Sequence, residues 1–297
     1  MKLNTGMRCH DICPKMEMEQ VFEQVGQLGV ENIQLALGKS IAGYDFGPGH
    51  FTPGLGRRIS GVLKEKGIHV TVLGCVINPA NPDEEARHMA VRRFTEHMKY
   101  ARILGADMVG TETGRMDAEG KFTPATYTEE AYRLMMKTME TIVEAAQKLG
   151  VIVGVEGGYN HVLHTPERMR RFLSEIASPN VEVIFDPMNL IHPDEMDEES
   201  QKRILDKAFN WYGDRITVLH VKDVAFEGEK QVFHYIGEGV FHYEPLLKWV
   251  KEEKPQIDLL LENCRPERYK KDTEYLQKLY NQPELFTTLP RMWLKAT

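Results

Sequence analysis

Short apolar runs that alternate with longer amphipathic segments form the main pattern of this chain. The amphipathic segments, such as 82–106, 128–150 and 165–177, have helical spacing and stop at Gly or Pro shortly before the next apolar run. Several of the short runs are apolar at successive positions, which is typical of parallel strands covered on both faces. Eight such strands are predicted, at residues 2–8, 31–36, 68–74, 106–111, 151–156, 181–186, 215–221 and 257–262.

The alternation of eight strands with roughly eight helices predicts an α/β fold, a (β/α)₈ TIM barrel. A length of 297 residues suits this architecture. An open, doubly wound sheet is the structural alternative, but its G-x-G-x-x-G fingerprint does not follow the first strand. Because no linker and no shift in composition interrupt the chain, we expect a single domain over residues 1–297.

Composition and charge exclude some classes of partner. The formal net charge is −7, which argues against nucleic acid because nucleic-acid-binding proteins usually carry a basic face. The sequence contains no run of about 18 apolar residues, so no membrane span is expected. The sequence begins without an apolar leader, and the four cysteines (Cys9, Cys13, Cys75 and Cys264) lack the spacing of a disulfide scaffold or zinc site. We therefore expect reduced thiols and a cytoplasmic location.

Four successive strands in the second half end in side chains that bind metals. They are Glu156, Asp186, His220 and Glu262. Any one of them alone would more often cap a helix or lie at the surface. In a barrel, however, strand ends carry the chemistry, and neighbouring strands lie about 4.8 Å apart. Two like charges about 4 Å apart repel by roughly 4 kcal/mol at an effective dielectric constant near 20, and a divalent cation removes this repulsion. Three carboxylates and one imidazole suit Mn²⁺ first, with Mg²⁺, Co²⁺ or Zn²⁺ as alternatives.

The motifs around these residues carry a family resemblance. With "VGVEGG", "FDPMN", "LHVKD", "IGEG" and "LLLEN" in this order, the chain resembles the xylose isomerase-like TIM barrel superfamily of sugar phosphate isomerases and epimerases. The resemblance implies that Glu156, Asp186, His220 and Glu262 bind one divalent metal ion. It also implies that Glu156 and Glu262 are catalytic, lie on opposite sides of a bound sugar and move protons. Such a metal stabilises the enediolate that forms when a proton leaves the carbon next to a carbonyl.

The sequence also departs from many ketose epimerases of that superfamily. Asn189 stands where they carry a His three residues after the strand-six Asp, and Lys222 is the nearest basic residue where they carry an Arg. A further Glu that follows their strand-five ligand is missing, and the stretch "GYNHVLH" stands there. We therefore expect this chain to share the scaffold of those epimerases, whereas their known ketose epimerase activity is expected to transfer to it poorly.

The predicted function is a metal-dependent sugar or sugar-phosphate isomerase or epimerase, and three alternatives stay open. A lyase similar to inosose dehydratase would use the same metal and carboxylates but expel water. A phosphodiesterase similar to the AP endonucleases would need three metals, and the strand ends "VLGCVINP" and "VGTETG" lack the histidines for them. The third alternative is a sugar-binding barrel without catalysis. The partner is a small molecule, with no nucleic acid and no membrane. A homo-oligomer is left open, because relatives often form dimers or tetramers.

Other polar residues near the strand ends are candidate substrate contacts, namely His10, Glu112, His161, Asn189, Lys222 and Arg265. Each could equally fix a loop or cap a helix. Arg115 is a weaker candidate for an anionic group, and Asp223 is expected to orient Lys222 by charge pairing. His88 and His97 are expected on a solvated helix face.

Overall fold

Eight parallel strands close into a barrel in the computed structural model, which describes residues 1–227 and 230–282. Around the barrel the strands follow the order β1-β10-β7-β6-β5-β4-β3-β2. This confirms the predicted TIM barrel, and each strand lies within one or two residues of its predicted range. The barrel strands are β1 (Asn4–Arg8), β2 (Asn32–Leu35), β3 (His69–Gly74), β4 (Met108–Glu112), β5 (Ile152–Glu156), β6 (Val181–Phe185), β7 (Ile216–Val221) and β10 (Asp258–Leu261).

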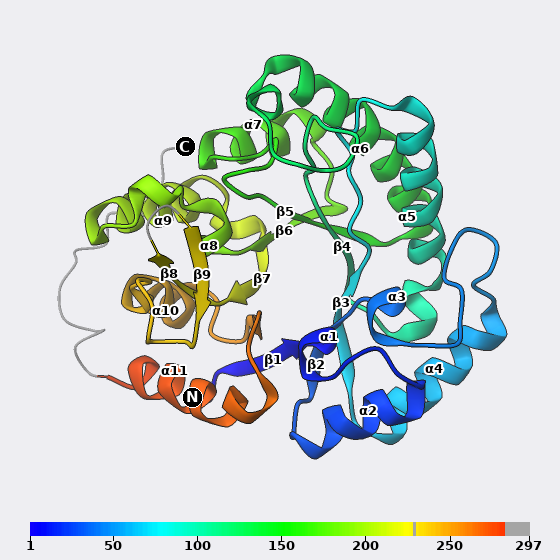
Figure 1. Cartoon of the computed structure of the whole chain (residues 1–297), viewed down its shortest axis with the longest axis horizontal. Helices are drawn as coiled ribbons and strands as arrows, with labels where there is room; N and C mark the ends of the chain where they lie inside the picture. The colour runs from blue at the N-terminus through cyan, green and yellow to red at the C-terminus, as the bar shows by residue number, and fades with distance from the viewer. Residues whose placement is uncertain (228–229, 283–297) are drawn as a thin grey trace.

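Helices surround the barrel on its outer side (Figure 1). The longer ones are α2 (Met18–Gln27), α4 (Pro53–Glu65), α5 (Glu84–Leu104), α6 (Glu129–Leu149), α7 (Pro166–Ile176), α9 (Glu198–Tyr212), α10 (Tyr243–Glu253) and α11 (Tyr269–Tyr280). Single turns are α1 (Cys9–Ile12), α3 (Leu37–Ser40), α8 (Pro187–Leu190) and the 3₁₀ turns η1 (Pro124–Tyr127), η2 (Pro193–Glu195), η3 (Gly213–Arg215) and η4 (Pro266–Arg268).

The helix ends follow the chemistry that the sequence predicts. The Thr165 hydroxyl caps α7 by accepting a hydrogen bond from the Arg168 amide, and Pro166 occupies the first turn. Gly105 and Gly150 end α5 and α6 with φ values of 69° and 65°, a left-handed conformation that favours glycine. At each of these helix ends the chain turns toward the start of the next strand.

The barrel interior is filled by one apolar layer below the site. It consists of Val72, Met108, Ile184, Val218 and Leu260, with Ile152 packed against it. Because side chains alternate between the two faces of a strand, residues two or four positions later also point inward. The inward positions at the carboxyl ends of β5, β6, β7 and β10 are therefore those of the four predicted metal ligands.

Three features differ from the prediction or lie outside it. An antiparallel hairpin, β8 (Asp223–Glu227) and β9 (Lys230–His234), interrupts the strict alternation between β7 and α10. His97 is buried rather than solvated, and its Nδ1 lies 2.9 Å from the Arg93 carbonyl oxygen. His88 is exposed, as predicted. The predicted single domain includes residues 228–229 and 283–297, which lie outside the described residues.

No helix within residues 1–227 and 230–282 combines the length and the apolar character that a membrane crossing needs.

The barrel wall makes a first testable prediction at Gly6, which faces inward from β1. A Cβ atom there would lie 2.1 Å from the Asn32 carbonyl oxygen and 2.8 Å from Leu260 Cδ2. We expect Gly6→Ala to lower the free energy of unfolding by about 2 kcal/mol or more, measured by urea denaturation, because backbone and core must shift. In the control Gly26→Ala, the new Cβ meets no heavy atom within 4 Å on α2, so stability should rise by about 0.5–1 kcal/mol. Equal stabilities would contradict this account.

Candidate functional site

The four predicted metal ligands meet at the carboxyl ends of consecutive barrel strands. Glu156 ends β5, His220 lies near the end of β7, and Asp186 and Glu262 directly follow β6 and β10. One ligand atom from each residue lies within 4.8 Å of the others. The side chains are almost dry, with exposed fractions of 7% (Glu156), 2% (Asp186), 2% (His220) and 9% (Glu262). Within the described part of the chain, no other group of at least three such residues converges in this way.

His220 lies between two of the carboxylates. Its Nδ1 is 3.1 Å from Glu156 Oε2 and 3.4 Å from Glu262 Oε2. Burial alone would lower the pKa of His220, but the neighbouring carboxylates outweigh burial and raise it. The pKa of the Asp186 carboxyl is raised to about 6, chiefly by burial. The other ring nitrogen of His220, Nε2, has no hydrogen-bond partner among the described residues.

Two cations, the buried Lys222 and the partly buried Arg8, balance the carboxylates. Lys222 Nζ lies 2.8 Å from both Asp186 Oδ2 and Glu262 Oε1, and Arg8 Nη1 lies 2.9 Å from Glu262 Oε1. Burial would lower the pKa of Lys222, but the carboxylates raise it, so its ammonium group stays charged. Burial would raise the pKa of Glu262, but the charges of Lys222 and Arg8 lower it below its usual range. Glu262 is therefore ionised at neutral pH.

Asn189 forms hydrogen bonds to Glu156, Lys222 and Asp186. Its side-chain amide donates to Glu156 Oε1 at 2.5 Å and accepts from Lys222 Nζ at 2.6 Å, while its backbone amide donates to Asp186 Oδ1. The Asp186 carboxylate thereby caps the short helix α8, which carries Asn189. Asn189 and Lys222, two predicted substrate contacts, thus lie among the ligands, and their contact with substrate stays a prediction.

Sequence reasoning missed a support on the β1 side of Glu262. Arg8 donates to both Asp11 carboxylate oxygens and, at 2.8 Å, to Asn263 Oδ1, while the Asn263 amide donates to Asp11. Asn263 has a φ of 55°, an uncommon conformation that these bonds hold in place. Arg8 ends strand β1 at an inward position, so its place at a strand end was the available signal.

Glu112 and His161 form a separate pair at the end of β4. His161 Nε2 lies 3.3 Å from Glu112 Oε2, and His161 is buried while Glu112 is partly exposed. Burial would raise the pKa of Glu112, but the hydrogen bond and charge of His161, with the charge of Arg115, lower it. The two predicted substrate contacts therefore form one close pair, in which Glu112 comes from the end of β4 and His161 from the loop after β5.

His10 and Arg265, the remaining predicted contacts, line a pocket of about 710 Å³ beside the cluster. His10 follows β1, and Arg265 lies three residues after Glu262. The Nδ1 atom of His10 is buried without a hydrogen-bond partner among the described residues. Burial, followed by the charge of Arg8, lowers the pKa of His10 to about 4, so the ring is neutral at pH 7.

Two weaker predictions are wrong. Arg115 does not face an anion site, because its guanidinium donates to the Asn160 and Gly120 carbonyl oxygens and to Asn160 Oδ1. Asp223 does not orient Lys222, because successive side chains of an extended chain point to opposite faces. Its carboxylate instead accepts hydrogen bonds from four backbone amides, those of Val224, Gly237, Gly239 and Phe241.

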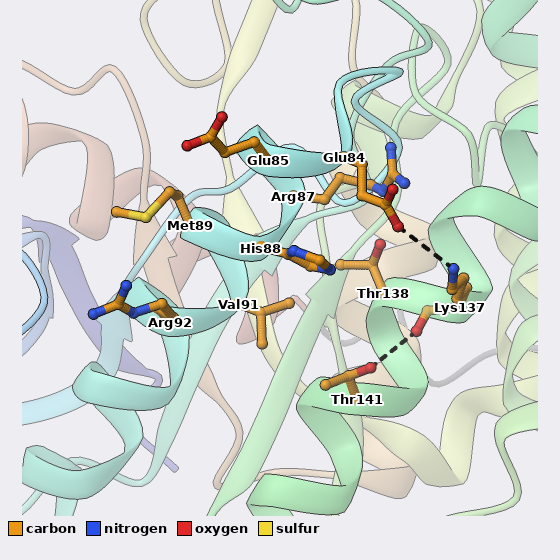
Figure 2. A pocket seen from close by; sticks show the side chains of 10 residues that line it. All are labelled: Glu84, Glu85, Arg87, His88, Met89, Val91, Arg92, Lys137, Thr138 and Thr141. Carbon is orange, nitrogen blue, oxygen red and sulfur yellow. Dashed lines mark hydrogen bonds and ion pairs between the residues drawn. The ribbon is translucent and has the colours of Figure 1, made fainter.

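A second hollow, of about 520 Å³, lies on the outer ring between α5 and α6 (Figure 2). Glu84 and Lys137 face each other across it at 3.8 Å. None of the predicted site residues lines it, and no buried cluster of metal-binding side chains lies there. The strand ends, rather than this groove, are therefore the candidate functional site.

The donor set at the strand ends fits a divalent cation. Three carboxylates and one imidazole converge within bonding reach of a common centre, and the His220 Nδ1 atom, which faces two of the carboxylates, has no hydrogen-bond partner among the described residues. Oxygen donors with one imidazole suit Mn²⁺ or Mg²⁺ and accept Zn²⁺. The two cations beside the cluster contact carboxylate oxygens, which leaves the imidazole without a competing positive charge at hydrogen-bond distance.

Comparison with known proteins places the chain in a family. The family model described as xylose isomerase-like TIM barrel matches residues 22–279. The chain belongs to this family. Comparison with curated protein sequences gives no significant match.

Solved structures share the fold across most of their length. A 3-keto-D-glucoside 4-epimerase from E. coli is 14% identical, with a TM-score of 0.71 over 93% of this chain and 100% of that chain. A D-tagatose 3-epimerase-like protein is 17% identical, with a TM-score of 0.72 over 93% and 97%. A xylose isomerase-like TIM barrel protein from Mycobacterium smegmatis in complex with magnesium is 14% identical, with a TM-score of 0.67 over 91% and 89%. At these identities the likeness is one of fold.

The protonation of the cluster predicts how its affinity for a metal depends on pH. The raised pKa values of His220 and Asp186, the latter about 6, mean that protons compete for these ligands in acid. Calorimetric titration of the metal-stripped protein with MnCl₂ should therefore show weaker binding at pH 5.5 than at pH 7.5, by about tenfold or more, with proton release. The control His69→Gln removes an exposed histidine at the start of β3 and should leave the pH dependence unchanged. A pH-independent affinity would contradict the assignment of these ligands.

Proposed function

We propose that this protein is a divalent-metal-dependent sugar or sugar-phosphate isomerase or epimerase that transfers a proton next to a carbonyl group. One observation carries the proposal: Glu156 and Glu262 reach His220 Nδ1 from two strands, at 3.1 and 3.4 Å, inside a nearly dry cluster of ligands. Two carboxylates on different sides of one centre are what a reaction needs when it removes a proton from one face and returns it to another.

Glu156, Asp186, His220 and Glu262 would hold the metal ion. When bound, a divalent cation would stabilise negative charge on the oxygens of the reacting sugar. The protein supplies the rest. Glu262 is kept ionised by Lys222 and Arg8, so it can accept a proton at neutral pH. Asn189 fixes the orientation of Glu156 by donating to its Oε1. Because all four ligands are on or directly after strands, their positions are set to the precision that proton transfer requires.

The predicted substrate contacts fit around this centre. We assign the hydroxyl groups of the sugar to the Glu112–His161 pair on one side and to His10 on the other. Asn189 and Lys222 would contact substrate from within the cluster, and Arg265 from the rim of the neighbouring pocket. The ion pairs of Lys222 with Asp186 and Glu262 support an additional positioning role, since a buried ammonium holds both carboxylates in place.

We propose Mn²⁺ as the metal, because hard oxygen ligands predominate in the set. The magnesium complex of the Mycobacterium smegmatis relative supports a hard divalent ion of this kind. We also propose a cytoplasmic location, which is supported by four buried, unpaired cysteines. Assembly into a homo-oligomer stays a prediction.

The rival functions make different demands on the site. A three-metal phosphodiesterase would need further clusters of ligands, and the described residues contain a single cluster. A lyase would use the same carboxylates, and its product would be lighter than the substrate by one water. The experiment below therefore follows both the label and the mass of the product.

The decisive test is solvent deuterium exchange into a panel of ketoses, aldoses and their phosphates, with Mn²⁺ present and product followed by NMR and mass spectrometry. Glu156→Gln should lower the exchange rate by about 10²–10⁴ while metal content is retained, because the amide keeps an oxygen ligand but cannot accept the proton. The control Glu85→Gln changes an exposed glutamate on α5 and should leave exchange unchanged. Unchanged exchange in Glu156→Gln would refute the catalytic role, and loss of water from the product would identify a lyase.

A further inference from the structure

A pocket of about 450 Å³, called the basic pocket below, lies where β2 and β3 end, and none of the four candidate metal ligands lines it. Its charged lining residues are Lys15, Lys39, Asp45 and Arg93, while Ala36 and Gly74 form its wall at the two strand ends. Figure 1 shows α3, which carries Lys39, beside β3 and on the opposite side of the barrel from β7. The volume is within the range of about 300–1,000 Å³ that is usual for small-molecule sites.

The three cations of the basic pocket are not neutralised by neighbouring acids. Lys15, Lys39 and Arg93 form no ion pair with any carboxylate of residues 1–227 and 230–282. Asp45, which also lines the pocket, is engaged within its own loop: its Oδ1 accepts a hydrogen bond from a backbone amide at 2.7 Å, and its Oδ2 lies 3.5 Å from His50 Nδ1. Like charges around one hollow repel each other, and a bound anion would remove that repulsion.

Backbone and side-chain contacts hold the lining of the basic pocket in place. The segment that carries Lys15 is bridged to the segment that carries Lys39 by two backbone hydrogen bonds, of 3.3 and 2.8 Å, made by the Met16 amide and carbonyl groups. The Arg93 guanidinium donates to the carbonyl oxygen of Val76, in the loop after β3. Because these segments are already fixed, a ligand would bind there with little further loss of conformational freedom.

Inward-facing side chains lead from the cluster of metal ligands to the basic pocket. Arg8 contacts Glu262 at 2.9 Å, and Gln34 is the register partner of Arg8 on the next strand. A Cβ atom at Gly74 would lie 3.2 Å from Gln34 Nε2, so the Gln34 amide reaches the wall of the pocket. The Gln34 side chain is only 8% exposed, and its Oε1 has no hydrogen-bond partner among the described residues. Since buried polar atoms normally have a partner, this oxygen indicates a ligand that donates to it.

The span between the cluster and the basic pocket suits a small molecule. Three strand steps lead around the barrel from β10, which precedes Glu262, to β3, and at about 4.8 Å a step they amount to about 14 Å along the wall. Side chains from both ends of this path point into the mouth, so the gap between them is shorter. Burial and the charge of Arg8 lower the pKa of His10 to about 4, and the charge of Lys39 adds to them, so Lys39 is within electrostatic reach of the residues beside the cluster.

We propose that the basic pocket binds the terminal phosphate group of the substrate, so that the substrate class is a phosphorylated ketose or aldose whose carbonyl end lies at the four ligands. Lys15, Lys39 and Arg93 contact the phosphate oxygens, and Gln34 accepts a hydrogen bond from a hydroxyl group on the carbon chain between the two ends. Such a molecule keeps the carbonyl group that the proton transfer needs. The proposal rests on the proposed function for the place of that carbonyl group.

The charge of the pocket matches a phosphate monoester. Three cations against one carboxylate leave an excess of two positive charges in the lining. A phosphate monoester carries a charge of about −1.5 to −2 at pH 7, and both Arg and Lys are common phosphate ligands. An uncharged sugar tail would leave the cations uncompensated.

The first test is calorimetric binding of inorganic phosphate to the MnCl₂-loaded protein after free Mn²⁺ has been removed. The double variant Lys15→Gln, Lys39→Gln should weaken this binding about tenfold or more, because two charged contacts are lost. Phosphate that bound to the metal ion alone would not depend on the two lysines. The control Lys64→Gln, Lys148→Gln removes the same charge from exposed positions on α4 and α6 and should retain the affinity.

The second test compares matched pairs of ketoses and aldoses with and without a terminal phosphate, again by calorimetry on the MnCl₂-loaded protein. We expect at least one phosphate ester to bind tenfold or more tightly than its parent sugar. The double variant Lys15→Gln, Lys39→Gln should weaken that ester at least fivefold more than the parent sugar. Gln34→Met keeps the volume and should weaken both members of the pair alike, because both carry the hydroxyl groups of the chain. Equal affinities of Gln34→Met and the unchanged protein would contradict the contact assigned to Gln34.

The outcomes separate this subsite from the proposed function. Binding needs no turnover, so a phosphate preference that depends on Lys15 and Lys39 supports the subsite even if no sugar exchanges deuterium. Exchange into free sugars with no phosphate preference in any pair overturns the subsite and leaves the proposed function standing. The subsite is also overturned if inorganic phosphate does not bind, or if the preference survives in the double variant. Loss of the preference in Arg265→Gln alone would place the phosphate in the pocket after β10 and would be equally contrary.

Discussion

Three buried carboxylates at one end of the barrel impose an electrostatic constraint on their neighbours. Glu156, Asp186 and Glu262 lie almost out of water, where repulsion between like charges is strong and solvent screens it little. Lys222 and Arg8 relieve that repulsion by direct contact, and the raised pKa of His220 is a response to the same field. The polar residues of the mouth are thus arranged around one local excess of negative charge.

The barrel makes this arrangement rigid. The apolar layer formed by residues such as Ile184 and Leu260 fills the interior directly beneath the carboxylates, and the two-residue period of each strand places the ligands above it. Small inward residues complete the fit: at Gly154, one position below Glu156 on the same face, a Cβ atom would lie 2.5 Å from Met108 Sδ. The site therefore depends on core packing as much as on its own hydrogen bonds.

The strand ends and the loops of the barrel mouth carry different groups of residues. The strand ends carry the four convergent side chains at fixed positions, whereas the hairpin and the residues after β1 and β10 line a separate pocket. Solved structures that share the fold are named after epimerases of different sugars, and one fold can host different activities. The Asp223 carboxylate, with four backbone amides as donors, links the two parts by fixing the chain between the hairpin and α10.

The sequence by itself determined the barrel and the four convergent candidate ligands, because strand periodicity and strand ends are local properties that the chain displays directly. It could not determine the partners of those ligands. Those partners depend on which inward positions meet when the first strand pairs with the last. Arg8 then contacts Glu262, Asn189 bonds to both Glu156 and Lys222, and Asp223 points away from Lys222. The hairpin after β7 was overlooked for a related reason: its short strands pair with each other and not with the barrel, so the count of eight barrel strands is unchanged by them. Contacts between residues far apart in the sequence, such as that of Arg8 with Asn263 across 255 positions, are decided by barrel closure and not by local sequence.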